Sequence, residues 1–149
     1  MYIPSPRPDA VARMRGGAEA PELSGAVEFY QKPQGVLIAA RVSGLPQENA
    51  SGFFALHIHE GSSCSGVVFA DTGSHYNPTD ALHPDHAGDL PPLLSYGGGK
   101  AYLAVITDRF RLRDVLGRTV VIHSGPDDFH SQPAGNAGRK IGCGVITRR

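Results

Sequence analysis

Histidine is the residue type whose number and spacing in this chain point most directly to chemistry. There are seven histidines, against two cysteines and no tryptophan, and five of the seven fall between positions 57 and 86. His57 and His59 stand two residues apart at the end of an apolar run. In a β-strand, side chains at this spacing share one face, so both rings can reach one ion. A pair of exposed histidines on a half-solvated strand is the alternative interpretation, and the pair alone does not exclude it.

A second set of ligand-type side chains follows in a long segment, from about 60 to 99, that is rich in Gly, Pro and Asp. His83, His86 and Asp89 stand three residues apart from one another, and His75 precedes them. Three imidazoles and a carboxylate suit tetrahedral Zn²⁺. The competing interpretation is a polar surface loop that is histidine-rich by chance. The metal site is favoured, because so long an irregular stretch in a compact domain is usually functional, disordered or held in place by a cross-link or a metal.

The other candidate residues stand apart from these two sets. His123 ends an apolar run, where it is either a ligand or a capping or core histidine, and His130 lies in a polar loop and is expected at the surface. Cys64 and Cys143 are the only cysteines. A disulfide between them would close a long loop, which chain-entropy estimates make stabilising. Two buried free thiols are the alternative, which a cytosolic location would favour.

Short strands between glycine and proline turns are expected to position these residues. Residues 9–15 lead into a Gly-Gly pair, and one helical turn fits 109–116. The runs with strand character are 23–31, 35–42, 53–59, 101–107, 118–123 and 142–147. Strands at this density, in a chain with 19 glycines and 12 prolines, predict an all-β antiparallel sandwich or barrel.

Length and charge narrow the class of protein further. The chain has 149 residues, which is one domain's worth (1–149), with residues 1–8 expected to form a flexible arm. Fourteen basic and fourteen acidic residues cancel, so no nucleic-acid partner and no membrane surface is predicted. No apolar run approaches the roughly 18 residues of a membrane-spanning helix. The first residues lack the apolar core of a secretory signal, so a cytoplasmic location is expected, although the mature form of an exported chain would read the same apart from its first residue.

Five strings give the chain a family resemblance that runs from about residue 23 to the C-terminus. In order they are HIHE, GSHYNP, HAGDLPPL, GRTVVIH and GNAGRKIGCGVI. Each string alone is weak evidence for any family. In this order, and with the cysteine pair in place, the strings together resemble copper/zinc superoxide dismutase. The resemblance implies a Greek-key β-sandwich or flattened barrel of about eight antiparallel strands, with long metal-binding and electrostatic loops. It also implies an enzyme that converts superoxide to O₂ and hydrogen peroxide at a copper centre beside a structural zinc.

The resemblance assigns roles residue by residue. The implied copper ligands are His57, His59, His75 and His123. The implied zinc ligands are His75, His83, His86 and Asp89, so His75 bridges the two metals and carries a proton during turnover. Asp127 is implied to hydrogen-bond ligands of both metals from outside, and Cys64 and Cys143 to form the intrasubunit disulfide. Copper would gain and lose the electron, because zinc is redox-inert.

The chain departs from the family pattern at a few positions, none of which is a metal ligand. Lys140 stands where the family usually has arginine, with Arg139 just before it, and we expect Lys140 to guide superoxide. Adjacent residues on an extended segment point to opposite faces, so only one of the two cations should face copper. Ala55 and Leu56 replace a usual glycine-aromatic pair. The segments from His59 to Cys64 and from His83 to His86 are short, as in bacterial members of the family.

Two other function classes compete with the enzyme. A non-catalytic superoxide-dismutase-like module that only binds copper and zinc would be expected to lack some copper ligands, whereas all four are present here. A hydrolytic zinc enzyme would need an open zinc position and a general base, whereas this ligand set fills the zinc site. A homodimer is one assembly compatible with the sequence, which does not itself fix the oligomeric state.

Overall fold

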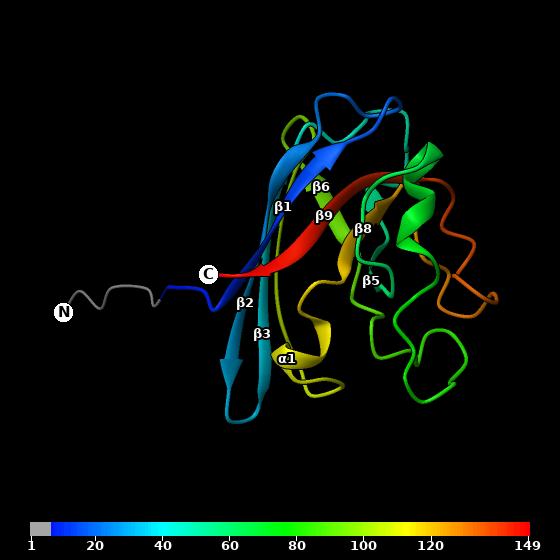
Figure 1. Ribbon diagram of the computed structural model, residues 1–149. Coiled ribbons are helices and arrows are strands. Elements are labelled where there is room, and N and C mark those ends of the chain that lie inside the picture. The colour runs from blue at the N-terminus through cyan, green and yellow to red at the C-terminus, as the bar shows by residue number, and fades with distance from the viewer. Residues whose placement is uncertain (1–6) are drawn as a thin grey trace.

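The computed structural model describes residues 7–149 (Figure 1). Within these residues one short helix, α1 (Leu112–Val115), and one 3₁₀ segment, η1 (Val67–Thr72), accompany nine strands. The strands are β1 (Ala10–Gly16), β2 (Ser24–Lys32), β3 (Gly35–Ser43), β4 (Phe53–Phe54), β5 (Leu56–His59), β6 (Leu93–Tyr96), β7 (Lys100–Thr107), β8 (Thr119–His123) and β9 (Lys140–Arg148). The all-β expectation is confirmed, with nine strands rather than about eight.

The strands form one antiparallel sheet in the order β4-β6-β7-β3-β2-β1-β9-β8-β5. Its two edge strands, β4 and β5, are consecutive in the chain and are joined through Ala55 alone. The Ala55 N–H donates to Gly125 O at 2.9 Å, and its carbonyl accepts from the His123 N–H at 2.9 Å. The chain therefore nearly closes the sheet into a barrel at this point. For the same reason the single strand predicted over 53–59 is wrong: Ala55 bonds to the last residue of β8 and to Gly125 just after it, which splits the run in two.

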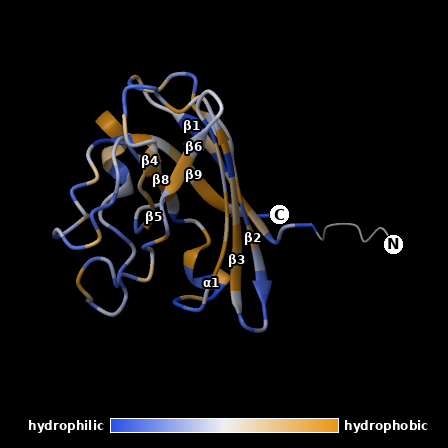
Figure 2. Ribbon diagram, turned by 180° about the vertical axis from the view of Figure 1, so that it is seen from behind, coloured by the Kyte–Doolittle hydropathy of each residue, from blue (hydrophilic) through white to orange (hydrophobic). Residues whose placement is uncertain are grey.

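The core lies inside this curved sheet and follows from alternation along the strands. In β3, Val36, Ile38, Ala40 and Val42 are buried, and the residues between them are more exposed. Alternation of this kind places one face of a strand against the interior. Figure 2 shows that β3 and β9 are largely apolar, whereas the outer loops mix polar and apolar residues.

The segment from 60 to 99 is more ordered than its sequence indicates. It contains η1 and β6, so the expectation of an irregular stretch is wrong at those two places. In β6, Leu93 is fully buried and Leu94 is 52% exposed, and each pairs with a residue of β4. The Gly and Pro around this strand mask its short alternating pattern. The helical turn predicted within 109–116 is confirmed as α1.

Two long loops lie side by side on one flank of the barrel, next to β5 and β8. They cover residues 60–92 and 124–139, the green and orange segments of Figure 1. Cys64 and Cys143 form a disulfide, as the resemblance implies, and this bond ties the first loop to β9. Most of the expected flexible arm, 1–8, lies outside the described residues. None of the helices in residues 7–149 has the length and apolar character needed to cross a bilayer.

Candidate metal centre

Strands β5 and β8 supply three of the predicted ligands from the barrel wall. His57 and His59 are on β5, and His123 is the last residue of β8, with all three between 0% and 3% exposed. The two strands are paired in register, with His57 opposite Val121. Two isolated bridges, His57 with Asp89 and His59 with His75, then hold the first long loop against β5. The two strands therefore bring His75 and Asp89 of the first long loop next to His57 and His59.

One group of four side chains results from this arrangement. Each offers a ligand atom, and the four atoms lie within 4.8 Å of one another. The members are His57, His59, His75 and His123, all of them buried. These are the four residues that the sequence predicts as copper ligands, and the structure brings them together.

The outward-facing ring nitrogens of three of these histidines are anchored by acceptors. His57 Nε2 lies 2.8 Å from Asp127 Oδ2, His59 Nδ1 lies 2.8 Å from the Gly73 carbonyl, and His123 Nδ1 lies 3.4 Å from the Gly138 carbonyl. Because each acceptor requires an N–H, the proton of each neutral ring sits on the anchored nitrogen. The lone pairs are therefore left on His57 Nδ1, His59 Nε2 and His123 Nε2.

These free lone pairs point at one another. His59 Nε2 and His123 Nε2 are 3.3 Å apart, and with this protonation both are acceptors, so they cannot bond to each other. His57 Nδ1 and His75 Nε2 are buried without a hydrogen-bond partner among the described residues. Buried polar nitrogens without partners are costly. A cation placed between them would satisfy all four.

Burial keeps these rings neutral, which is the state that a metal requires. Loss of solvation lowers the pKa of His59 to about 2 and that of His123 to about 3, and the neighbouring imidazoles add to both effects. Burial also lowers the pKa of His57, although its hydrogen bond to Asp127 opposes the shift. At neutral pH these nitrogens therefore present lone pairs rather than protons.

A second group adjoins the first and shares His57 and His75 with it. His57, His75, His83 and Asp89 also offer ligand atoms within 4.8 Å of one another. His75 Nδ1 lies 2.8 Å from Asp89 Oδ1, and His83 Nδ1 lies 3.1 Å from Asp89 Oδ2 without hydrogen-bond geometry. His86 is not in this group of four, but its Nδ1 lies 3.2 Å from both His75 Nδ1 and Asp89 Oδ2. The four predicted zinc ligands are therefore neighbours, and they provide three nitrogens and a carboxylate.

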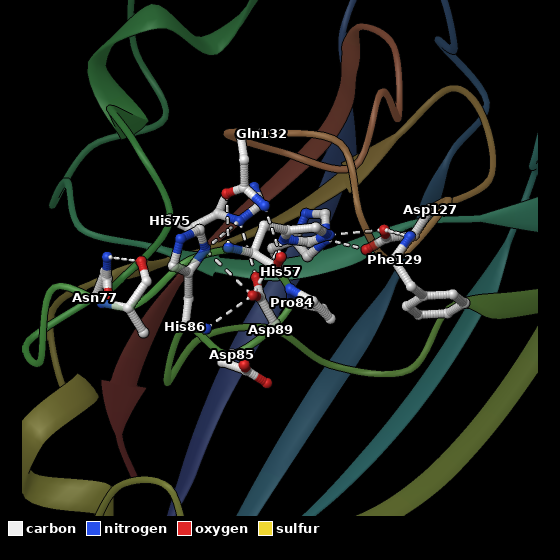
Figure 3. A network of polar contacts seen from close by, with 12 residues as sticks. His57, His75, Asn77, Pro84, Asp85, His86, Asp89, Asp127, Phe129 and Gln132 are labelled. Carbon is white, nitrogen blue, oxygen red and sulfur yellow. Dashed lines mark hydrogen bonds and ion pairs between the residues drawn. The ribbon is translucent and has the colours of Figure 1, made fainter.

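Asp127 links the two groups by bonding the ring nitrogens that face away from the ligand atoms (Figure 3). Its carboxylate accepts from His57 Nε2 at 2.8 Å and from His83 Nε2 at 2.7 Å. Burial raises the pKa of Asp127, but the hydrogen bonds from the two histidines outweigh it and hold that pKa well below its usual range. An ionised Asp127 fixes both rings with their Nδ1 atoms turned inward.

Lys140 faces the group of four histidines. Its Nζ donates to Thr72 Oγ1 at 2.7 Å and to the Gly73 carbonyl at 3.0 Å, and the same carbonyl accepts from His59. Burial lowers the pKa of Lys140. Its positive charge contributes in turn to the lowered pKa values of His59 and His123. The cation is thus fixed beside the candidate copper ligands.

Arg139, next to Lys140, and His130, the seventh histidine, do not point toward the group of four histidines. Arg139 forms an exposed ion pair with Glu19. The side chain of His130 is 79% exposed and lies 3.7 Å from Asp128 Oδ2. The predicted surface position of His130 is confirmed. Of the two adjacent cations, Lys140 is the one oriented toward the cluster.

Sequence reasoning missed two side chains that bind the backbone of the first loop. Gln132 hydrogen-bonds both main-chain groups of His83, and Arg109 donates to the carbonyls of Pro84 and His86. A glutamine or arginine in a polar loop carries no spacing pattern, because its partners are main-chain atoms. No signal in this one sequence identifies them.

The donor sets fit copper and zinc. Four neutral imidazoles suit copper, and three imidazoles with a carboxylate suit tetrahedral zinc. The family model described as copper/zinc superoxide dismutase matches residues 23–146. The chain belongs to this family.

Individual members of the copper/zinc superoxide dismutase family cover most of the chain. "Superoxide dismutase [Cu-Zn] 2" of Aquifex aeolicus is 38% identical over an alignment of 139 residues that covers 84% of this chain and 80% of that protein. "Superoxide dismutase [Cu-Zn]" of Deinococcus radiodurans is 33% identical, and the match covers 84% of this chain and 78% of that protein. The solved Cu/Zn superoxide dismutase from Brucella abortus is 26% identical with a TM-score of 0.77, over 92% of this chain and 99% of that one. Copper and zinc are therefore the metals of this family, and the two groups of side chains can hold them.

Proposed function

We propose that the protein converts two superoxide anions and two protons into O₂ and hydrogen peroxide. In this proposal copper is held by His57, His59, His75 and His123. Zinc is held by His75, His83, His86 and Asp89. The observation that carries the proposal is the convergence of four ring-nitrogen lone pairs at one buried point, three of them fixed there by hydrogen bonds to the opposite nitrogen.

The metals and the side chains contribute different things. Bound copper supplies one-electron oxidation and reduction, whereas zinc is redox-inert and orders its ligands. His75 has one nitrogen in each group, so a proton held at His75 Nε2 lies among the candidate copper ligands, where a reduced dioxygen species needs it. His57, His59 and His123 do not compete for this proton, because burial lowers the pKa of each ring. Proton delivery is thereby assigned to one ring.

Lys140 attracts the substrate in this proposal. Superoxide is an anion and the chain has no net charge, so attraction must come from local positive charge. Lys140 Nζ is anchored next to the Gly73 carbonyl that also holds His59. Lysine keeps the charge of the arginine usual in the family but lacks its planar fork. We therefore expect steering to be retained and docking of the anion to be less well defined.

The non-catalytic module is the weaker candidate. Such a module has no need for four copper-type ligands, an anchored cation beside them and a shared histidine. The direct test is to reconstitute the protein with zinc alone and with copper plus zinc, and to measure metal content and the decay of superoxide. About one copper and one zinc per chain with fast decay only in the copper-loaded sample supports the enzyme. Slow decay at full copper occupancy would overturn it in favour of the module.

The assembly of the protein is a separate proposal. Phe53 and Leu94, paired across β4 and β6, are 41% and 52% exposed. Tyr96 at the end of β6 and Tyr102 on the neighbouring β7 are also exposed. This apolar outer face supports association of two copies. Light scattering of the purified protein at micromolar concentration decides it, because a monomer mass would contradict the homodimer.

A further inference from the structure

The turn from His83 to His86 presents two of the proposed zinc ligands without the support of a helix or strand. Both histidine side chains are buried, while Asp85 between them is exposed. A four-residue turn of this kind depends on partners for its main-chain groups, because an unpaired buried N–H or C=O is costly. Some of these partners are local, since the Asp85 N–H donates to the Leu82 carbonyl and the His86 N–H to Asp89 Oδ2. The His83 main chain and the Pro84 carbonyl are instead bound by two side chains from segments far away in the sequence.

Gln132 pairs with the main chain of His83 on both sides of the residue. The His83 N–H donates to Gln132 Oε1 at 2.8 Å, and Gln132 Nε2 donates to the His83 carbonyl at 2.7 Å. A second bond from the same Nε2, to the His130 carbonyl at 3.0 Å, holds the carboxamide in its own loop. A carboxamide has a donor and an acceptor side by side, so it can match a backbone N–H and C=O as a neighbouring strand would.

Asp127 and Gln132 belong to the same loop and hold His83 at different atoms. Asp127 fixes the ring through Nε2, and Gln132 fixes the main chain. Figure 3 shows these two side chains approaching the cluster from different directions. Together they determine both where His83 Nδ1 lies and which way it points.

Arg109 holds the other end of the turn from the segment between β7 and α1. Its Nη1 donates to the Pro84 carbonyl at 2.9 Å and to the His86 carbonyl at 3.0 Å. Bonds from a charged donor to carbonyl oxygens are stronger than neutral ones. The guanidinium is 41% exposed, so we expect its contribution to be smaller than that of Gln132.

We propose that Gln132 and Arg109 are positioning residues that hold residues 83–86 in the ligand-bearing conformation and so determine how long the protein retains zinc. The inference rests on the proposed function, since zinc is the ion concerned. Without the two side chains, the metal would have to order the His83 end of the turn with help from only the local hydrogen bonds at Asp85 and His86, and the lost backbone freedom would weaken binding. Changes to residues that hold metal ligands typically cost roughly 10- to 100-fold in metal affinity.

The test measures zinc release from the copper- and zinc-loaded protein into an excess of a chromogenic chelator. Gln132→Met removes both hydrogen-bonding groups at similar length, and Arg109→Met removes the cation. Matched controls are Gln34→Met, in the exposed turn between β2 and β3, and Arg113→Met, exposed on α1. We expect zinc to leave Gln132→Met roughly 10-fold faster than the unmodified protein, Arg109→Met to show a smaller increase, and both controls to match the unmodified protein.

A second pair of variants separates positioning from a general loss of folding. Gln132→Glu keeps an acceptor for the His83 N–H but has no donor for the His83 carbonyl, so it should fail to restore slow release. Arg109→Lys keeps a charged donor and should restore part of it. Absorption bands of Co²⁺ placed in the zinc site should shift in Gln132→Glu and stay unchanged in Gln34→Met.

The possible results separate the positioning role of Gln132 and Arg109 from the proposed function on which it rests. Zinc release at the unmodified rate in Gln132→Met and Gln132→Glu would overturn that positioning role. So would equal acceleration in Gln34→Met, since release would then report only surface substitution. If the unmodified chain bound no zinc at all, the proposed function would be overturned instead.

Discussion

The sheet of β1, β2 and β3 and the flank formed by the two long loops are held together in different ways. β2 and β3 pair without interruption from Ser24 opposite Ser43 to Lys32 opposite Gly35. The loop 60–92 meets β5 through two isolated bridges, three backbone hydrogen bonds at Leu56 and Ile58, and the bond between His59 Nδ1 and the Gly73 carbonyl, rather than through a continuous ladder. Stability is therefore spread over many similar backbone bonds in the sheet, and concentrated in a few particular contacts in the loops. Substitutions in the sheet should change folding, and substitutions in the loops should change metal binding.

The largest expected effect comes from the histidines of β5 and β8, against which the loops pack, and it is the response of the metal-free protein to acid. His59 and His123 have pKa values of about 2 and about 3 when folded, against about 6.5 when unfolded. Below pH 6.5 the unfolded chain therefore binds more protons, and stability falls as the pH falls. By linkage each ring loses roughly 2 kcal/mol of unfolding free energy between pH 6.5 and pH 5.

Chemical denaturation at a series of pH values measures this loss. The His123→Asn variant lacks one of these rings and should show a smaller slope. An unfolding free energy that stays flat from pH 7 to pH 5 would show that the buried histidines of β5 and β8 do not carry the acid sensitivity.

The converse experiment places a cavity in the sheet. Ile38 is fully buried and pairs with Phe29 and Val105 on the two neighbouring strands. Ile38→Ala should lower the free energy of unfolding by roughly 2–5 kcal/mol. Zinc and copper affinity, measured by competition with a chelator, should stay the same. A large loss of metal affinity in this variant would mean that the two regions are not independent.

A single methyl group tests the loop flank. Gly135 has φ +74°, and a Cβ there would collide with the Asp127 carboxylate and lie 2.6 Å from His83 Nε2. Gly98 has φ +82° with nothing within 4 Å of the added atom. Both alanine variants carry the backbone strain of about 1 kcal/mol, so only the collision differs. Gly135→Ala should lose roughly 10- to 100-fold in zinc affinity, and Gly98→Ala should not; equal affinities would contradict the role given to Asp127.

The smallest effect concerns the two adjacent cations. Lys140→Gln removes charge next to His59, whereas Arg139→Gln removes charge that is paired with Glu19 at the surface. At matched copper content and low salt, Lys140→Gln should slow dismutation severalfold and weaken its salt dependence. Arg139→Gln should behave like the unmodified protein. The reverse pattern would assign guidance to Arg139.

The same contrast explains how much could be predicted from the sequence. Alternation in residues 23–31 predicts β2 and its buried face, with Val27 and Phe29 inside, because a ladder needs only the period of two. The paired spacing of His57 and His59, and the family strings around His75 and His123, predict the cluster. Gln132 and Arg109 could not be predicted, because their partners are carbonyl and N–H groups that every residue has. β6 could not be predicted either, because its four residues are surrounded by turn-forming glycines and prolines.

The central claim is that the two groups of ligands meet at His75, and removing that ring tests it most directly. His75→Ala is compared with His130→Ala, which removes a ring that is 79% exposed and outside both groups. Copper and zinc affinities of both variants are measured by equilibrium competition. We expect both affinities to fall in His75→Ala by more than the roughly 100-fold upper end seen for residues that only support ligands, and neither to change in His130→Ala. Retention of either metal at the affinity of the unmodified protein in His75→Ala would contradict the shared site.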